Sequence, residues 1–243
     1  MTAPDGLFSP PFAHRGLWRP GESPENSLSA FERACQAGYG IELDVRLSRD
    51  GEVIVFHDAT LERMAGVEAS IWDLSAAELG ATPLRGGPDM IPTLSRTLEL
   101  VAGRSLVLVE IKAGPDGGGE LEARTAALLD RYRGPVAVIS FEAEALAWFA
   151  LHRPGVARGL DAMGLSDEDL AKATTDLSVG FDAACTRAQP DFLVLEIETA
   201  RGRLARARRA QGTPVIAWTV RTTEDVDRVA EDCENFIFEG FTA

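Results

Sequence analysis

Short runs of β-favouring apolar residues alternate with helical patterns along most of the chain. This alternation predicts parallel β/α architecture, because parallel strands need helical crossovers between them. The length of 243 residues suits one (β/α)8 barrel, and no Gly-rich nucleotide loop follows any run, which disfavours an open doubly wound sheet. We therefore expect an α/β fold of the TIM (β/α)8 barrel class. The expected strands are residues 12–14, 39–45, 106–111, 136–140, 156–160, 192–196, 215–220 and 236–238.

Helical periodicity and capping residues mark the connections between these strands. Asn26 or Ser27 can cap a helix that ends at Gly38, and Thr93 can cap a second helix that ends at Gly103. Ser166 and Thr223 are plausible caps further along the chain. The other expected helices are residues 120–132, 142–152, 166–173, 199–211 and 223–231.

The region after the second expected strand does not follow this alternation of strands and helices. Residues 45–58 read as extended structure with a turn at Asp50-Gly51, since Asp-Gly is a strong hairpin signal. Residues 59–92 form a long connection with few regular patterns, and long insertions after a barrel strand usually lie over the active site. We expect one domain over residues 1–243, with a short insertion at about residues 59–92.

The charge of the chain limits its partners. The net charge is −14, with 38 acidic against 24 basic side chains, which argues against nucleic acid and against an anionic membrane surface. The basic run from Arg201 to Arg209 is best interpreted as a solvated helix face.

Cysteine content and hydropathy indicate the compartment. The three cysteines have no close spacing, which suggests free thiols suited to a reducing cytoplasm. The start of the chain lacks a signal-peptide pattern, and nowhere do 18 apolar residues run together. We expect a soluble cytoplasmic protein without stable membrane insertion. The first nine residues and residues 114–119 are the runs that resemble disorder.

Acidic side chains interrupt two of the apolar strands. Glu42 and Asp44 lie two residues apart, so both point to one face of their strand, where they would repel each other. A divalent cation or a salt bridge to Arg or Lys would relieve this repulsion. Glu110 and Lys112 repeat the spacing on the next strand, and Glu110 would complete a three-carboxylate site suited to Mg²⁺ or Ca²⁺. Lys112 could bind a phosphate oxygen, or pair with Glu110 as a structural ion pair.

The three histidines and one tryptophan are the remaining candidates. His14 precedes Arg15 and Gly16 at an expected strand end, a combination that suits anion binding, and His57 ends another apolar strand. His152 lies near the end of an expected helix, where a partly positive histidine needs no chemical role. Trp218 lies on a late strand, either as core packing or as an aromatic wall against a substrate.

Taken together, these residues and their neighbours resemble the glycerophosphodiester phosphodiesterase family. The matches follow the family order and cover almost the whole chain, and those up to Arg63 are highly specific. Departures are Ser27 in place of the usual Thr, the surroundings of Gly66 and the ending over residues 235–241. The matching segments are His14-Arg15-Gly16, Pro24-Glu25-Asn26-Ser27 with Ala30-Phe31, Glu42-Leu43-Asp44, Asp50-Gly51 with Val53, His57-Asp58 with Leu61 and Arg63, Ile91-Pro92-Thr93-Leu94, Glu110-Ile111-Lys112, Ser140-Phe141 and Trp218-Thr219-Val220.

The resemblance implies a metal-dependent hydrolase of lipid and glycerol metabolism that cleaves small-molecule glycerophosphodiesters to an alcohol and glycerol phosphate. It implies a TIM barrel with one divalent cation, Mg²⁺ or Ca²⁺. The site residues that it implies are His14 and His57 as the catalytic acid and base, Arg15 and Lys112 as phosphate-binding residues, and Glu42, Asp44 and Glu110 as metal ligands. We add Trp218 as an expected substrate-binding residue.

Several alternatives stay open at this point. The attacking group is either water or a neighbouring substrate hydroxyl, which would give a cyclic phosphate first. Either histidine can be the acid. The chain could instead be a lyase or phospholipase acting on larger lipid phosphodiesters, or a barrel that binds without catalysis. The sequence predicts neither the head group nor the oligomeric state.

Overall fold

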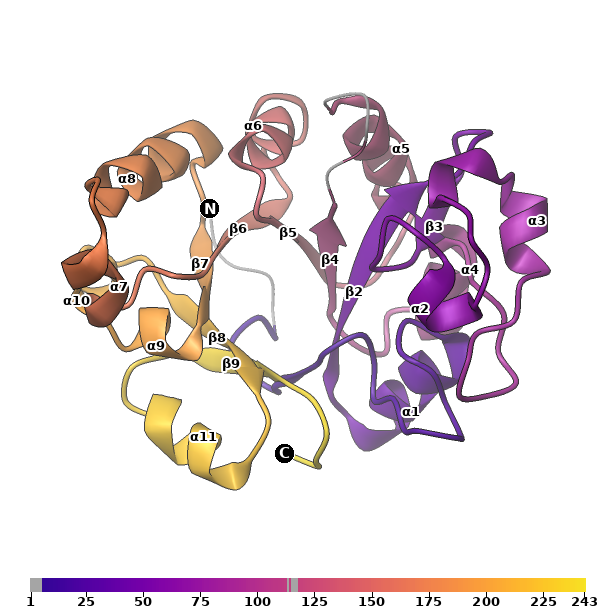
Figure 1. The fold of residues 1–243 in the computed structure, drawn as a ribbon, viewed down its shortest axis with the longest axis horizontal. Helices are drawn as coiled ribbons and strands as arrows, with labels where there is room; N and C mark the ends of the chain where they lie inside the picture. The colour runs from indigo at the N-terminus through magenta and orange to yellow at the C-terminus, as the bar shows by residue number, and fades with distance from the viewer. Residues whose placement is uncertain (1–5, 113, 115–117) are drawn as a thin grey trace. The chain divides into compact units, whose positions relative to one another are not determined.

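The computed structural model describes residues 6–112, 114 and 118–243, which form two compact units. Residues 12–136 make up the N-terminal unit, and residues 6–11 together with 137–243 make up the C-terminal unit. Figure 1 colours the chain by residue number, so each unit can be followed separately. The disorder expected for the first nine residues and for residues 114–119 falls in part on residues 1–5 and 115–117, which lie outside the described residues.

Three parallel strands and one antiparallel strand form the sheet of the N-terminal unit. β2 (Gly40–Leu47) lies between β1 (Phe12–Ala13) and β4 (Val107–Ile111), and both neighbours run parallel to it. β3 (Val53–Val55) returns antiparallel to β2 after the turn at Gly51, as the Asp-Gly pair predicts. The register places Asp44 of β2 opposite Glu110 of β4.

Helices α1 (Leu28–Ala37), α4 (Leu94–Val101) and α5 (Glu120–Leu129) accompany these strands. Ser27 caps α1 through its hydroxyl, and Thr93 caps α4 in the same way, as predicted. α1 ends at the left-handed Gly38, whereas α4 ends at Ala102, one residue before the expected Gly103. α1 packs against α4.

The connection at residues 59–92 is more regular than its sequence indicates. It contains α2 (Glu62–Ala65), the 3₁₀ helix η1 (Ile71–Asp73) and α3 (Ala76–Gly80). Capping boxes begin η1 and α3, but each helix is too short for a periodic apolar pattern to reveal it. Its own small core holds it together, formed by Ile54, Phe56, Leu61, Ile71, Leu79, Leu84 and Ile91.

Five parallel strands form the sheet of the C-terminal unit, in the order β9-β8-β7-β6-β5. The helices differ from the sequence prediction in three places. α8 was not predicted, the helix expected at 199–211 is broken at Gly202 into α9 and α10, and Thr222 rather than Thr223 caps the last helix. The strands are β5 (Val136–Ser140), β6 (Ala157–Ala162), β7 (Phe192–Glu196), β8 (Val215–Val220) and β9 (Asn235–Phe238), and the helices are α6 (Ala143–His152), α7 (Asp167–Lys172), α8 (Leu177–Ala188), α9 (Ile197–Ala200), α10 (Arg203–Ala210) and α11 (Thr223–Val229).

Strands β1, β2 and β4–β9 are the eight parallel strands expected from the sequence, and helices alternate with them. This element order confirms the TIM (β/α)8 barrel class. The prediction of one domain over residues 1–243 stays a prediction. Among the helices of the described residues, none has the length and apolar character that crossing a membrane requires.

The predicted placement of two sets of polar residues in the C-terminal unit is confirmed. The basic residues of α10 lie on a solvated face, where Arg206, Arg208 and Arg209 pair with Asp232, Asp182 and Glu234. His152 ends α6, and its Nδ1 atom lies 2.9 Å from the Trp148 carbonyl oxygen.

Candidate active site

Three buried carboxylates meet on neighbouring strands of the N-terminal unit. Glu42 and Asp44 share one face of β2, as their spacing of two predicts, and Glu110 projects from the adjacent β4. Their relative exposures are 1%, 0% and 7%. One oxygen from each residue lies within 4.8 Å of the others, so the three form a group that could hold a metal ion.

The electrostatics of this group fit a divalent cation. Burial and the negative charges of Asp44 and Glu110 raise the pKa of Glu42 well above its usual value. Burial and Asp44 raise the pKa of Glu110 to about 7. The Oε1 atom of Glu42 is buried without a hydrogen-bond partner within the described part of the chain. Hard oxygen ligands of this kind suit Mg²⁺ or Ca²⁺, and either ion would relieve the repulsion among the carboxylates.

Lys112 lies at the edge of the carboxylate group, just beyond the end of β4. Its Nζ atom donates a hydrogen bond to Glu110 Oε1 over 2.5 Å and lies 3.0 Å from Asp44 Oδ1. Burial disfavours the charged ammonium, but the two carboxylates outweigh burial and raise the pKa of Lys112 to about 12. Lys112 therefore carries a full positive charge, and the Glu110–Lys112 ion pair expected as one alternative is present.

His14 and Arg15 follow directly after β1. The Nε2 atom of His14 lies 3.9 Å from Glu42 Oε2, and the main-chain N–H of Arg15 donates to the same oxygen over 2.9 Å. The Arg15 guanidinium donates to Glu25 Oε1 over 2.8 Å and approaches Asp44 Oδ2 at 3.5 Å. This places a guanidinium beside the three carboxylates, and the anion binding expected for His14-Arg15-Gly16 stays a prediction.

Left-handed backbone conformations fix the loop that carries Arg15. Arg15 has a φ of +56° and Asn26 a φ of +54°, which are unusual values for residues other than glycine. The Asn26 main-chain N–H donates to the Arg15 carbonyl over 2.9 Å, and its side chain donates to Asp44 Oδ2 over 2.7 Å. Gly16 follows at φ +80°, where a Cβ atom would lie 2.9 Å from Ala30 and Phe31. The chain needs glycine here, because a side chain would clash with α1 and would be strained at this left-handed φ.

His57 follows β3 and has a carboxylate partner. Its Nδ1 atom lies 2.7 Å from Asp58 Oδ1. Burial opposes ionisation of Asp58, but Arg63 and His57 outweigh burial and lower its pKa, so the carboxylate accepts and His57 Nδ1–H donates. This tautomer leaves Nε2 as the proton-accepting atom of the neutral ring. Burial lowers the pKa of His57 and Asp44 opposes that shift.

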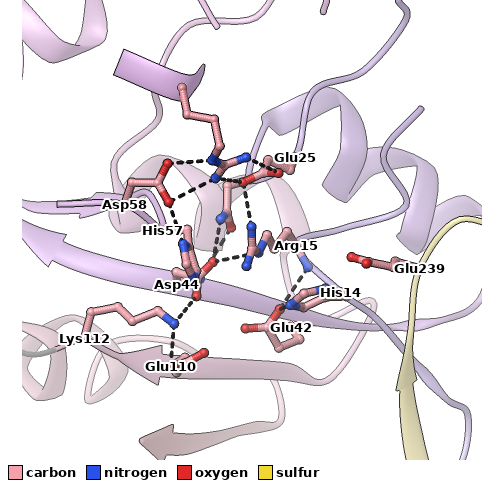
Figure 2. A network of polar contacts seen from close by, with 12 residues as sticks. His14, Arg15, Glu25, Glu42, Asp44, His57, Asp58, Glu110, Lys112 and Glu239 are labelled. Carbon is pink, nitrogen blue, oxygen red and sulfur yellow. Dashed lines mark hydrogen bonds and ion pairs between the residues drawn. The ribbon is translucent and has the colours of Figure 1, made fainter. Parts of the chain in front are cut away.

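Two further ionised residues complete the network, and the sequence assigned them no role. Arg63 of α2 donates hydrogen bonds both to Asp58 and to Glu25, and Glu25 in turn accepts from Arg15. Figure 2 shows this run of contacts from His57 through Asp58 to Glu25 and Arg15. Glu25 and Arg63 both lie in segments that match the family pattern, and this match was the feature of the sequence that could have marked them as site residues.

The structure therefore brings together seven of the eight predicted site residues: His14, Arg15, Glu42, Asp44, His57, Glu110 and Lys112. The eighth, Trp218, lies on β8 in the C-terminal unit, where its ring meets Phe141 edge-on with centroids 5.5 Å apart. Its predicted contact with the substrate stays a prediction.

Comparison with known proteins decides the family. The sequence model of the glycerophosphoryl diester phosphodiesterase family matches residues 14–232. The chain belongs to this family. The predicted resemblance is confirmed, and with it membership of an enzyme family of phosphoric diester hydrolases.

Relatives and solved structures of this family match most of the chain. A glycerophosphodiester phosphodiesterase of Caldanaerobacter subterraneus is 27% identical over 234 residues, which cover 89% of this chain and 88% of the relative. A phosphodiesterase structure from Oleispira antarctica, in complex with the product sn-glycerol-3-phosphate, is 23% identical with a TM-score of 0.79, covering 94% of this chain and 91% of its own. A glycerophosphodiester phosphodiesterase structure from Thermotoga maritima is 25% identical with a TM-score of 0.70, covering 93% and 92%. These likenesses confirm the fold.

Proposed function

We propose that this protein hydrolyses glycerophosphodiesters to an alcohol and glycerol phosphate, with one divalent cation, Mg²⁺ or Ca²⁺, and with His14 and His57 as its acid–base pair. The observation that carries the proposal is the convergence of both histidines, two cationic side chains and three buried carboxylates within one unit. Family membership supports the reaction class. The Oleispira protein, with its bound product sn-glycerol-3-phosphate, supports the product class.

The proposed metal ligands are Glu42, Asp44 and Glu110. A divalent cation held there would act as a Lewis acid on the phosphoryl group. The cation matters because a phosphodiester is anionic and resists attack by another electron-rich group.

The two positively charged side chains of the site, Arg15 and Lys112, would neutralise the negative charge that develops on the phosphoryl oxygens. Both side chains are mostly buried, with 16% and 13% exposure, so their charges act with little screening by solvent. The Arg15 guanidinium already donates to Glu25 through one Nη atom, which fixes its plane and directs the remaining donors.

The two histidines would transfer the protons. Asp58 holds His57 in the tautomer that keeps Nε2 ready to take a proton, and it would stabilise the imidazolium once formed. His14 presents its Nε2 atom beside Glu42. One histidine would deprotonate the attacking water or substrate hydroxyl, and the other would protonate the leaving alkoxide.

Two single substitutions test the histidine assignment. His14→Ala and His57→Ala are each expected to lower kcat by roughly 10²- to 10⁴-fold on a glycerophosphodiester while the fold is retained. His152→Ala is the matched control, because His152 contacts Trp148 on α6 in the other unit, and its activity should equal that of the unmodified protein. Normal turnover by both His14→Ala and His57→Ala would overturn the assignment.

An assay with an aryl phosphodiester distinguishes the histidine that acts as the acid from the one that acts as the base. A nitrophenolate leaving group needs no proton, so the variant that lacks the acid should recover most of its rate on the aryl substrate. The variant that lacks the base should stay inactive on both substrates. Phosphorus NMR of the products would separate hydrolysis from the alternative lyase reaction, for which a cyclic phosphate would be the end product.

We also propose that the protein works in the cytoplasm. Cys35, Cys185 and Cys233 are all free thiols, which suits a reducing compartment. Fractionation of the source cells, with detection of the protein by antibody, would test this location.

A further inference from the structure

We infer that Glu25 and Arg63 are positioning residues that hold Arg15 and His57 in a single arrangement. This inference rests on the proposed function, in which Arg15 contacts phosphate and His57 moves a proton. The pair, called the Glu25–Arg63 bridge below, contacts neither the carboxylate group nor a reacting atom within the described residues. It acts through the two residues that do.

Arg63 is the centre of the bridge. Its Nε and Nη2 atoms donate to Asp58 over 2.7 and 3.1 Å, and its Nη1 and Nη2 atoms donate to Glu25 over 2.9 and 2.6 Å. The guanidinium thus binds two carboxylates at once, each through two oxygens. Such paired, charge-assisted bonds fix the plane of each carboxylate as well as its position.

Each carboxylate in turn orients one residue of the proposed catalytic site. Asp58 accepts from His57 Nδ1 over 2.7 Å, and Glu25 accepts from Arg15 Nη1 over 2.8 Å. Positive and negative groups alternate along the run. The hydrogen bonds and charges of Arg63 and Arg15 outweigh burial and lower the pKa of Glu25, so the carboxylate keeps its charge.

The segments that meet here are short or irregular. Arg15 follows a two-residue strand, Glu25 stands in the loop before α1, and Arg63 belongs to the four-residue helix α2. A single turn of helix is not stable alone. Arg63 therefore connects the insertion at residues 59–92 to the loops after β1 and β3, and each loop carries one of the residues that touch substrate in the proposed reaction.

The solvent exposure of the Arg63 side chain helps to distinguish a positioning role from a role in folding. The Arg63 side chain is 47% exposed, and an ion pair with that much solvent contact contributes little to stability. The bridge thus has the geometry to orient two reacting residues, and its Arg63 end is too exposed to be a main source of folding energy, although Glu25 itself is only 14% exposed. Its loss should change the rate far more than the fold.

The chain offers a matched control on the same unit. Arg104 donates two hydrogen bonds to Glu32 over 3.0 and 2.5 Å, and its side chain is 42% exposed. This pair is also a paired guanidinium–carboxylate contact, but it joins the end of α4 to α1 and touches none of the proposed site residues. Arg104→Gln therefore removes a paired contact of an arginine with similar exposure without touching the bridge, although Arg104 binds one carboxylate and Arg63 binds two.

The first experiment compares kinetics of single variants on a glycerophosphodiester. Arg63→Gln and Glu25→Gln are each expected to lower kcat/KM by about 10- to 100-fold, the usual effect of removing a residue that orients a reacting group. Arg63→Lys should not restore the rate, because a single ammonium cannot bind two carboxylates through four hydrogen bonds. Arg104→Gln should stay within twofold of the unmodified protein.

The second experiment is chemical rescue of Arg63→Ala. Because the site of Arg63 is open to solvent, added guanidinium ion should occupy it and restore kcat in a saturable way, whereas ammonium at the same ionic strength should not. A residue needed only for folding would give no such rescue, since a small cation cannot refold the inactive fraction.

Two results would overturn the inference. One is activity of Arg63→Gln and Glu25→Gln within twofold of the unmodified protein. The other is a loss that tracks the unfolded fraction by circular dichroism and that guanidinium does not reverse. Failure of the proposed function itself would look different, because His57→Ala would then retain full activity or the unmodified protein would not hydrolyse the substrate.

Discussion

Asn26 donates a hydrogen bond from Nδ2 to Asp44 Oδ2 over 2.7 Å, and thereby ties a strained loop residue to the most buried carboxylate of the site. Asn26→Ala removes a donor to a charged acceptor and places alanine at φ +54°. The free energy of unfolding should fall by roughly 2–4 kcal/mol, the sum of a lost charged hydrogen bond and left-handed strain. Urea titration measures this loss.

The exposed Gln36→Ala serves as its control and should change stability by less than about 0.5 kcal/mol. Equal stability of the two variants would show that the Asn26–Asp44 bond does not hold the loop.

Ionisation of Glu110 should make stability depend on pH. Its folded-state pKa of about 7 lies above the value of about 4.3 expected for an unfolded chain, so the folded protein binds this proton more tightly. The stabilisation is complete below about pH 4 and is lost as pH rises through 7. Thermal melts of the metal-free protein from pH 5.5 to 8.5, compared with Glu110→Gln, isolate this contribution. A pH dependence identical in both proteins would contradict it.

The same titration predicts how the affinity for a divalent cation changes with pH. A divalent cation binds only deprotonated carboxylates. At pH 6 most Glu110 carries a proton that Mg²⁺ or Ca²⁺ must displace, whereas at pH 8 most Glu110 is already ionised. Affinity measured by isothermal titration calorimetry should therefore rise between these values and then level off. An affinity that does not change would place the cation away from Glu110.

Removal of metal should abolish hydrolysis reversibly. Dialysis against EDTA is expected to remove activity, and addition of Mg²⁺ or Ca²⁺ should restore it and raise the melting temperature, since an ion bound to the folded state stabilises that state. Asp44→Asn should show no metal-dependent rise, because the variant lacks one of the three carboxylates. Full activity after EDTA with no metal detected would make the carboxylate group structural.

The insertion should contribute stability of its own. Leu61 is fully buried in the small core at residues 54–91, so Leu61→Ala should lower the free energy of unfolding by about 2–5 kcal/mol. Val67 lies in the same connection with 39% exposure, and Val67→Ala should cost less than about 0.5 kcal/mol. Equal denaturation midpoints for both variants would mean that this core does not unfold with the rest of the protein.

The strands could be predicted from their continuous apolar runs, and the carboxylate group from the period of two that places alternate residues on one face. Apolar runs mark buried parallel strands, and Glu42, Asp44 and Glu110 interrupt that pattern on one face. Helix α8 could not be predicted in this way. Its buried residues Phe181, Cys185 and Ala188 do follow the helical period, and Asp176 caps its start, but Gly180 weakens the pattern inside a helix that packs against α6.

The roles of Glu25 and Arg63 were beyond sequence reasoning for a different physical reason. They stand in a loop and in a one-turn helix, where no repeat fixes the direction of a side chain. The contact between Glu25 and Arg63 joins residues 38 positions apart. Only the folded backbone brings such partners together.

The proposed acid–base pair, the three carboxylates and the two phosphate-binding cations all come from one uninterrupted part of the gene product, residues 14–112. A directed-evolution library can therefore vary codons 137–243 broadly while every one of these groups keeps its identity. Exposed positions in the second half of the gene should then tolerate change more readily than these groups, whereas Trp218 and the buried strand residues of that half stay constrained.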